Sequence, residues 1–162
     1  MTSSQAAAIA VRRANARDED LLLRWANDPT TRTASFRPAP IEASAHHRWL
    51  ADRLASPSTR LLIGSEGPVP VGQVRFERRP DGAVEIGISV APEARGRGLG
   101  RALLRTGLEA ARRDAALEAR SFVARIRVDN EVSARLFGGA GFSLRERTLR
   151  DGVPCLVFEL DP

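Results

Sequence analysis

Hydrophobic residues recur at helical spacing in four segments of the 162-residue chain. In the strongest of them, residues 97–114, Leu99, Leu103 and Ala110 share one face. Pro29 is expected to end the first helix near residue 27, because proline disfavours helix at the residue before it. The proline-containing segment 30–41 is expected to form a loop. The predicted helices are residues 18–27, 43–54, 97–114 and 131–137.

Short apolar runs bounded by turn residues predict the strands. Residues 67–68 and 81–82, each with a glycine, separate three of them, and residues 150–152 close a final hairpin. The order is strand, two helices, three strands, helix, strand, helix and two strands. This order indicates a mixed α/β or α+β domain with a largely antiparallel sheet. The predicted strands are residues 9–13, 60–65, 71–78, 83–90, 122–128, 143–149 and 154–160.

The length fits one domain, residues 9–162, after a disordered or frayed N-terminus of residues 1–8. No apolar run approaches the roughly 20 residues that a membrane span needs. No secretory signal is recognised either, so we expect a cytoplasmic protein without a membrane partner. The single cysteine, Cys155, excludes an internal disulfide and a multi-cysteine metal cluster, and no metal is expected.

The basic residues of the chain are all arginines. There are 25 of them, with no lysine and no tyrosine, and the net charge is +5. The missing lysine excludes a P-loop and a lysine Schiff base. A modest excess of positive charge does not by itself indicate nucleic-acid binding, so no nucleic-acid partner is expected.

The most informative segment joins a strand that ends at Val90 to the long helix. Glycines at 96, 98 and 100 let backbone N–H groups approach a ligand closely, and a helix start and three arginines add positive charge. This pattern predicts a pyrophosphate site; the alternative is a glycine-rich helix start with solvated arginines. The predicted residues are Arg95, Gly96, Arg97, Gly98, Leu99, Gly100 and Arg101.

A dinucleotide fold would need a glycine at position 101 and alternating strands and helices, and neither is present. The spacing [QR]-x-x-G-x-[GA] fits at Arg95, Gly98 and Gly100, and it resembles the acetyl-CoA signature of the GNAT superfamily of N-acyltransferases. Residues 130–142 resemble a second stretch of that superfamily, N-x-x-[SA]-x-x-[LF]-[YF]-x-x-x-G-F. With two motifs in order and a matching element order over residues 9–160, the chain is identified as a GNAT member.

The resemblance implies the acyl-CoA N-acyltransferase fold, a splayed, mostly antiparallel sheet of about seven strands flanked by about four helices. It also implies acetyl-CoA as co-substrate, with the pantetheine arm in a gap beside the strand 83–90. The N–H near Val90 would be the oxyanion donor, and the amides of residues 96–101 would hold the pyrophosphate. Asn130 has a second interpretation, as a helix N-cap. The implied contacts of the pantetheine arm and thioester are Ile88, Ser89, Val90, Asn130, Ser133 and Phe137.

Acetyl transfer needs a neutral amine, a stabilised oxyanion and a protonated or solvated thiolate. The family's usual acid is a tyrosine, but Phe137 stands at that position, so another group, a water or a solvated thiolate must serve. Glu85 is the first candidate for the base, provided that burial raises its pKa; a substrate-anchoring or surface carboxylate is the alternative. His46 is the second candidate, against a histidine that packs beside Trp49.

The N-terminal third narrows the resemblance. R-W-x-N-D-P at residues 24–29, followed by Arg32, His46 and Trp49, is similar to the nucleotide-sugar N-acetyltransferases of pseudaminic acid biosynthesis. The same pattern occurs in ribosomal-protein N-terminal acetyltransferases. Asn27, Arg32 and Trp49 suit a sugar nucleotide by hydrogen bonds, charge and stacking. The alternative is that the tryptophans pack two helices on the sheet and Asn27 ends a helix.

The sequence therefore predicts an acetyl-CoA-dependent N-acetyltransferase that transfers acetyl directly to a primary amine of a small molecule, with a nucleotide-linked amino sugar as the first candidate. A protein N-terminal acetyltransferase and a non-catalytic acyl-CoA-binding domain are the alternatives. Monomer and homodimer both stay open.

Overall fold

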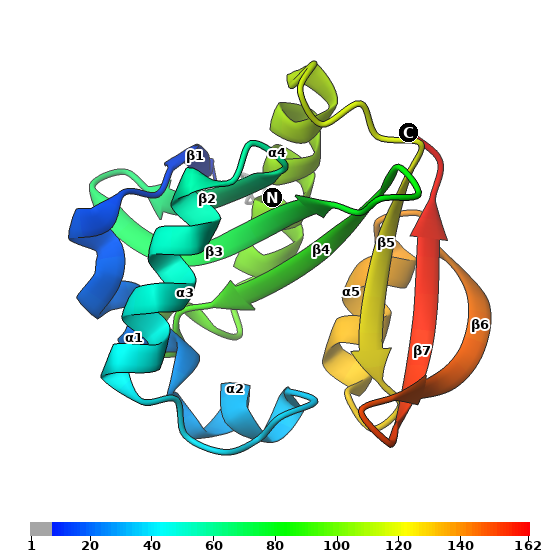
Figure 1. Cartoon of the computed structure of the whole chain (residues 1–162), viewed down its shortest axis with the longest axis horizontal. Helices are drawn as coiled ribbons and strands as arrows, with labels where there is room; N and C mark the ends of the chain where they lie inside the picture. The colour runs from blue at the N-terminus through cyan, green and yellow to red at the C-terminus, as the bar shows by residue number, and fades with distance from the viewer. Residues whose placement is uncertain (1–7) are drawn as a thin grey trace, which may run out of the picture.

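The computed structural model describes residues 8–162. One seven-stranded sheet runs through the molecule in the order β1-β2-β3-β4-β5-β7-β6 (Figure 1). Every neighbouring pair is antiparallel except β4 and β5, which are parallel. The strands are β1 (Ala10–Arg13), β2 (Thr59–Glu66), β3 (Val69–Arg78), β4 (Ala83–Val90), β5 (Ser121–Arg127), β6 (Ser143–Arg150) and β7 (Val153–Leu160). The predicted fold class is confirmed.

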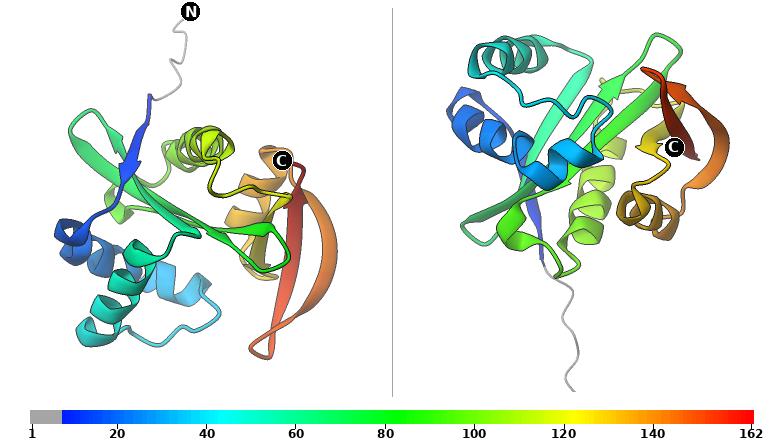
Figure 2. Two further views of the ribbon diagram at one scale, coloured as in Figure 1. Left: turned by 45° about the horizontal axis from the view of Figure 1, so that its top comes forward. Right: turned by 90° about the horizontal axis from the view of Figure 1, so that it is seen from below.

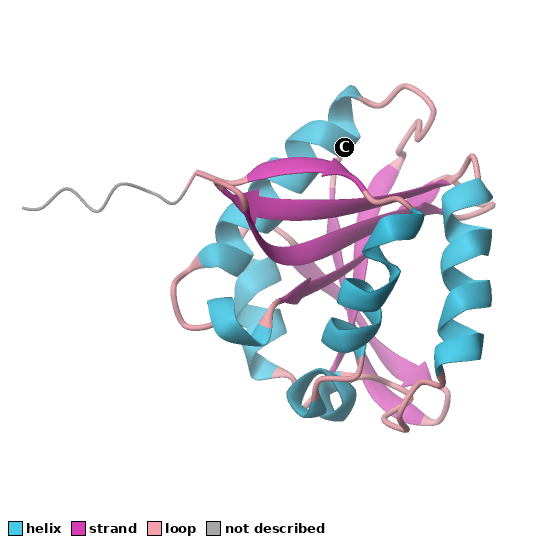
Figure 3. Ribbon diagram, turned by 90° about the vertical axis from the view of Figure 1, so that its left-hand side faces the viewer, coloured by secondary structure: helices cyan, strands magenta, loops and turns pink. Residues whose placement is uncertain are grey.

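Helices cover both faces of this sheet (Figures 2 and 3). The helices α1, α2 and α3 lie on one face, and α4 and α5 lie on the other. Short 3-10 turns precede α1 and α4, at Ala16–Asp18 and Pro92–Ala94. The helices are α1 (Glu19–Ala26), α2 (Pro29–Ala34), α3 (Ala43–Ala55), α4 (Leu99–Arg113) and α5 (Glu131–Gly139).

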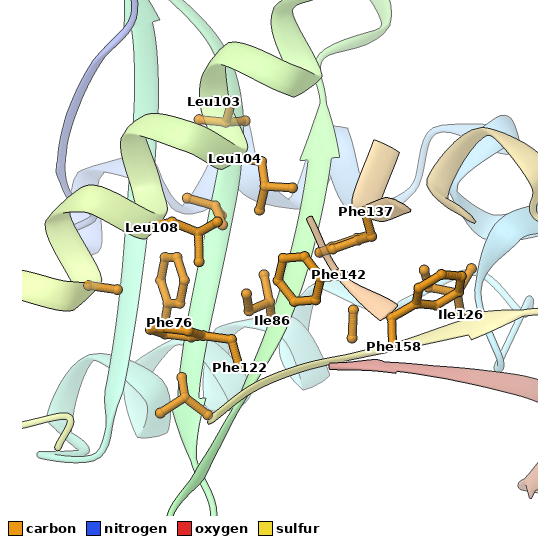
Figure 4. Close-up of a cluster of buried hydrophobic side chains, with 14 of the residues drawn as sticks. Phe76, Ile86, Leu103, Leu104, Leu108, Phe122, Ile126, Phe137, Phe142 and Phe158 are labelled. Carbon is orange, nitrogen blue, oxygen red and sulfur yellow. The ribbon is translucent and has the colours of Figure 1, made fainter. Parts of the chain in front are cut away.

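The larger core lies between the sheet and α4 and α5 (Figure 4). Alternate residues of the central strands point into it, and Phe76 of β3 meets Phe122 of β5 edge to face at 6.1 Å between ring centroids. Leu103 and Leu104 of α4 are fully buried against these strands. This packing fixes the position of α4, and with it the glycine loop at the start of the helix.

A second core lies under α1 and α3, on the opposite face. Trp25 of α1 and Leu50 of α3 are each 2% exposed, and they pack on Leu61 and Ile63 of β2. Trp25 therefore packs α1 on the sheet, which agrees at this position with the alternative interpretation that the tryptophans are packing residues.

The structure corrects two of the predicted elements. Residues 29–34 form the helix α2, which was predicted as loop, so there are five α-helices among the described residues. Asp28 caps α2 through the Thr31 N–H, and Pro29 occupies the first helical position, where its missing N–H is harmless. The proline that ends α1 thus begins the next helix. The second correction concerns α4, which begins at Leu99 and not at residue 97, because Gly98 is left-handed.

The predicted frayed segment, residues 1–8, lies outside the described residues except for Ala8. Among the residues described, no helix combines the length and apolar character needed to cross a bilayer.

The close approach of α4 to the sheet depends on Gly107. A Cβ at this position would lie 2.8 Å from Cγ1 of Val74 and 3.4 Å from the ring of Phe76. Gly107→Leu is therefore expected to lower the free energy of unfolding by about 1–3 kcal/mol through overpacking. Urea unfolding measures the change. Arg105→Leu, at an exposed position of the same helix, is the control. It should change the free energy of unfolding little, because arginine and leucine have similar helix propensity. Equal stability of both variants would contradict the tight packing of α4.

Candidate active site

The central feature of the site is the separation of β4 from β5. The two strands pair only at residues 83–85 with 121–123, although β4 continues to Val90 and β5 to Arg127. On its other edge β4 stays paired with β3 up to Val90, which lies opposite Gly72. Beyond Glu85 the strands diverge and leave a V-shaped gap in the sheet (Figure 1). The splay that the family resemblance implied is present.

The hydrogen-bond pattern of β4 shows which backbone groups face this gap. The Ala91 N–H donates to the Val71 carbonyl and the Arg79 N–H to the Ala83 carbonyl, which puts the odd-numbered residues of β4 in bonding register with β3. Antiparallel ladders alternate, so the even-numbered residues turn their N–H and C=O groups to the other edge. Ile88 and Val90 therefore direct their backbone polar groups into the gap, whereas the backbone of Ser89 bonds to β3.

The glycine loop lies at the open end of the gap, between the end of β4 and the start of α4. Gly96 and Gly98 have φ values of 77° and 74°, a backbone conformation that glycine adopts without strain. No atom lies within 4 Å of the Cβ position at either residue, so the loop presents backbone on an open side. Left-handed glycines followed by the free N–H groups of a helix start are an arrangement that can bind phosphate oxygens.

Two arginines of the loop are bound to other parts of the chain. Arg95 donates to the Asp28 carboxylate at 2.7 Å and to the Thr31 hydroxyl at 3.1 Å, and both partners belong to the cap and first turn of α2. Arg97 reaches Glu66 at 2.8 Å. Arg101 is exposed and close to Gly139 of α5, where a Cβ would lie 3.7 Å from its Nη2. Arg101 is therefore the loop arginine best placed to meet an anion.

The helix α2 spans the open end of the gap from one strand to the other (Figure 1). Arg95 holds its first turn beside β4, and Arg127 of β5 donates to the Ser35 carbonyl at 3.0 Å, just after its last turn. A pocket separates α2 from the start of α5. Its lining residues are Pro29, Thr30, Thr33, Ala34, Asp129, Asn130, Glu131, Val132 and Arg135.

The second motif forms the start of α5. The Asn130 side chain accepts the Ser133 N–H at 3.2 Å and donates to the Ser133 hydroxyl at 3.0 Å, so the N-cap interpretation is confirmed. Phe137 is 2% exposed and packs edge to face on Phe142 at 5.1 Å (Figure 4). The ring at the family's tyrosine position is thus part of the core behind the gap.

The sequence matches the family model of the acetyltransferase (GNAT) domain over residues 9–143. The chain belongs to the GNAT acetyltransferase family. No curated protein matches the chain by sequence.

Solved GNAT structures share the whole architecture. The chain resembles a ribosomal-protein-alanine N-acetyltransferase from Brucella melitensis, with a TM-score of 0.79, 24% identity and 94% and 99% of the two chains covered. It resembles a spermidine N-acetyltransferase from Vibrio cholerae with a TM-score of 0.82, 15% identity and coverage of 94% and 95%. An aminoglycoside acetyltransferase gives a TM-score of 0.82, 18% identity and coverage of 95% for both chains. At these identities the likeness establishes the fold.

The face of the sheet under α1, α2 and α3 carries polar side chains on three central strands. They are Gln73, Arg75 and Glu77 of β3, Glu85 and Ser89 of β4, and Arg125 and Arg127 of β5. Central strands that face a helical layer are usually apolar on both faces. This polar surface, which borders the gap, is therefore the candidate floor of an acceptor site, and we refer to it as the acceptor floor.

Glu85 lies on this floor, beside the point where β4 leaves β5. Its side chain is 14% exposed, and its oxygens contact Arg150 at 2.7 Å, Arg79 at 2.5 Å and Arg125 at 3.3 Å. Burial alone would raise the pKa of the Glu85 carboxyl, but the three guanidinium charges outweigh it and the pKa is lowered. The raised pKa on which the base hypothesis depended is thus corrected: Glu85 is ionised throughout the neutral range.

His46 lies away from the gap, on α3. It is 3% exposed, its Nδ1 has no hydrogen-bond partner among the described residues, and its ring lies 5.6 Å from Trp49. Burial lowers the pKa of His46 against the weaker effect of Glu19, so the imidazole is neutral near pH 7. The burial of the ring agrees with the packing interpretation. Trp49 is only half-buried and faces Arg75, whose Cζ lies 5.5 Å from the indole centroid.

Asn27 and Arg32 were predicted to bind the acceptor, and the structure places Asn27 at the end of α1 and Arg32 in α2, where both bond to the segment before α3. The Asn27 amide makes two 2.8 Å hydrogen bonds with the backbone of Ile41. Arg32 donates to the carbonyls of Ala26 at 2.6 Å and Arg37 at 2.9 Å, and to the Ser35 hydroxyl at 3.1 Å. Their donors are used to shape the loop that borders the acceptor floor. Of the three residues in this set, only Trp49 reaches the floor itself.

Two further groups bear on the chemistry of the site. Cys155 is fully buried and burial raises the pKa of its thiol, so it has no access to a substrate. Among residues 8–162, no cluster of three or more His, Cys, Asp or Glu side chains is placed to hold a metal ion.

Sequence reasoning missed the arginines around Glu85. Arg75 and Arg125 were treated as ordinary strand residues, and the hairpin residue Arg150 was placed only in a turn. The sequence pattern that could have revealed them is the alternation of polar and apolar residues along β3 and β5. On an edge strand this pattern would indicate a solvent-exposed face. It indicates a site when the same strands lie in the middle of the sheet.

The left-handed conformation of Gly98 gives a direct test of the loop. Gly98→Ala is expected to lower the free energy of unfolding by about 1–2 kcal/mol, because an L-residue is strained there. Gly138→Ala is the matched control: Gly138 lies in α5 without a positive φ, and no atom lies within 4 Å of its Cβ position. Chemical denaturation compares the two variants. Equal stability of Gly98→Ala and Gly138→Ala would show that the loop adopts another conformation.

Proposed function

We propose that the protein is an N-acetyltransferase that transfers the acetyl group of acetyl-CoA directly to a primary amine. The observation that carries the proposal is the three-residue pairing of β4 and β5, with a glycine cradle at the open end of the resulting gap. The anion-binding loop follows directly on the unpaired edge of β4. Together they fit a ligand that has a pyrophosphate, for the loop, and a long polar arm, for the strand edge. Acetyl-CoA complexes among the structural neighbours support the same assignment.

The chain offers a separate group for each part of acetyl-CoA. Backbone N–H groups of residues 96–101 would hold the pyrophosphate, with Arg101 beside them. The backbone of Ile88 and Val90 would bond the pantetheine arm, with Ser89, Ser133 and Asn130 nearby. The Val90 N–H would donate to the thioester oxygen. The position of Gly100 agrees with this arrangement, because its Cβ position lies 3.4 Å from Cγ2 of Val90 and the start of α4 therefore lies directly against the end of β4.

Acetyl-CoA supplies the acetyl group as a thioester. The amine forms a bond from its nitrogen to the acetyl carbon, the bond from carbon to sulfur breaks, and the nitrogen loses one proton. Glu85 is the proposed acceptor of that proton through water, because its ionised carboxylate borders the gap. Its lowered pKa makes it a relay that passes the proton on to solvent. The sulfur takes a proton from water, because Phe137 has none to give and the chain contains no tyrosine. The burial of Cys155 supports direct transfer without an acyl-enzyme.

The proposed acceptor is a small molecule, with a nucleotide-linked amino sugar first. The structural neighbours include enzymes named for spermidine and for aminoglycosides, so small amines are common acceptors in this fold. A protein N-terminus is the second candidate, favoured by the likeness to the Brucella ribosomal-protein-alanine N-acetyltransferase.

The first test measures thiol release from acetyl-CoA with a panel of primary amines: UDP-linked amino sugars, free amino sugars, polyamines and peptides with free N-termini. We expect turnover with at least one small-molecule class. Calorimetry with CoA should show binding that Gly98→Ala weakens by about tenfold or more, because the loop amides move, while Gly138→Ala binds normally. Tight CoA binding without turnover of any amine would leave a non-catalytic acyl-CoA-binding domain. Turnover of peptides alone would support the second candidate.

The second test addresses Glu85 through pH. The pKa of Glu85 is lowered from about 4.5, so this carboxyl does not titrate between pH 6 and 9. The fall of kcat/KM toward acid pH should therefore report the pKa of the acceptor amine. Glu85→Gln is expected to lower kcat by about 10²–10⁴-fold across this range without shifting this fall. Glu146→Gln, at an exposed position of β6, is the control. An unchanged rate in the Glu85→Gln variant would reject the proton-acceptor role.

A further inference from the structure

Arg75 is the most unusual charged residue of the acceptor floor. It lies on β3, in the middle of the sheet, and its side chain is 31% exposed. Its nearest carboxylate oxygen, on Glu77, is 3.7 Å away, and the guanidinium has no hydrogen-bond partner among the described residues. Burial lowers the pKa of Arg75, more strongly than the charge of Glu77 raises it. No guanidinium nitrogen of Arg75 is both buried and unpartnered, so its donors reach solvent and are free to bind a ligand.

Arg75 is held in a fixed direction by its neighbours. The guanidinium lies 5.5 Å from the centroid of Trp49 and passes over β4 at Gly87, where a Cβ would approach its Nη2 to 3.0 Å. Any side chain at position 87 would press on this guanidinium, so glycine permits the crossing. Gly87 faces the floor between Glu85 and Ser89, and it lies three residues before Val90. At about 3.3 Å per residue, the guanidinium is roughly 10 Å from the proposed thioester position.

The charges around Arg75 favour an anion. The charges that act on Arg75 are Arg53 and Arg150, against the carboxylates of Glu77 and Glu85. Two further arginines, Arg79 and Arg125, flank Glu85. Arg53 and Glu77 form a pair at 2.9 Å, and Glu85 is shared by the other three arginines. The Nη1 atom of Arg125 is buried without a hydrogen bond. Each carboxylate is thus already occupied by arginine, and Arg75 is left with positive charge to offer.

We propose that Arg75 binds an anionic group of the acceptor, a phosphate or a carboxylate, and thereby selects anionic amines over polycationic ones. This inference rests on the proposed acetyl transfer and adds the class of acceptor. The amine and the anionic group must lie several bonds apart, since one points into the gap and the other reaches Gly87. A planar guanidinium suits both oxyanions through paired N–H donors. Trp49 supports the guanidinium by cation–π stacking and fixes its plane.

The experiment compares acceptors that differ in the anionic group alone, glucosamine 6-phosphate with glucosamine and 4-aminobutyrate with its amide. Spermidine represents the polycations. For the preferred anionic acceptor we expect kcat/KM at least tenfold above its uncharged partner, with a preference that weakens as salt increases. The phosphate and carboxylate pairs show which oxyanion is used. A faster reaction with the uncharged partners or with spermidine would overturn the proposal.

Arg75→Gln should raise KM for the anionic acceptor by about 10- to 100-fold with kcat nearly unchanged, and it should remove the preference over the uncharged partner. Arg75→Lys keeps the positive charge and should retain part of the preference for the anionic acceptor. Arg113→Gln, at an exposed position at the end of α4, makes the same change of charge and should behave as wild type. A preference that survives in Arg75→Gln, or an equal loss for charged and uncharged acceptors, would overturn the proposal.

Binding separates this inference from the proposed reaction. Calorimetry titrates glucosamine 6-phosphate and 4-aminobutyrate into protein saturated with CoA, so that the glycine loop is already filled. Binding of either compound that Arg75→Gln abolishes and Arg113→Gln preserves would support the anion site even if no amine in the panel is acetylated. Equal binding by Arg75→Gln and wild type, or no binding of either compound to wild type, would reject the site while leaving acetyl transfer itself untouched.

Discussion

The limited pairing of β4 with β5 is the constraint on which the rest of the site depends. Three paired residues hold the strands together at one end, and the backbone groups of Ile88 and Val90 then face an open edge. Backbone groups inside a protein need partners, so such an edge persists only where a ligand or water supplies them. Each arm of the V is held from outside, β4 by β3 and β5 by β7, and the rings of Phe137 and Phe142 pack behind the gap. The opening is therefore part of the folded structure.

Arginine side chains make many of the polar contacts that hold the loops and α2 in place in this chain, which has no lysine and no tyrosine. The planar guanidinium group donates in several directions, so a single side chain can hold a whole loop, as Arg32 does with three carbonyls and a hydroxyl. Arg95 and Arg127 use the same property to attach α2 to both sides of the gap. The net charge of +5 is thus distributed over structural contacts. Arg75 remains without a hydrogen-bonded carboxylate, and it is the arginine that the proposed anion site uses.

Most of the fold followed from local patterns. The strand 83–90 was predicted with its observed bounds, and all seven strands were found, because apolar runs between glycine turns are strong local signals. The glycine loop was predicted for a similar reason, because its conformation depends on the glycines of the loop itself. The helix α2 was missed because Pro29 both ends one helix and begins another. The acceptor floor was missed for a different reason: Arg75, Glu85 and Arg125 meet only through the strand order, which no local pattern contains.

The absence of tyrosine also has a physical resolution within this site. A thiol has a pKa of about 8.5, so near pH 7 a thiolate that leaves without its proton is less stable than the thiol by only about 2 kcal/mol. Protonation by water therefore has to supply only this difference, and no side-chain acid is required. The amine, by contrast, must lose its proton, and the acceptor of that proton has to be a base that stays ionised. In the proposed reaction Glu85 meets this demand as a relay, which takes the proton through water and, because its pKa is lowered, passes it on to solvent and stays ionised. Phenylalanine at position 137 then adds to the core without depriving the reaction of a group that it requires.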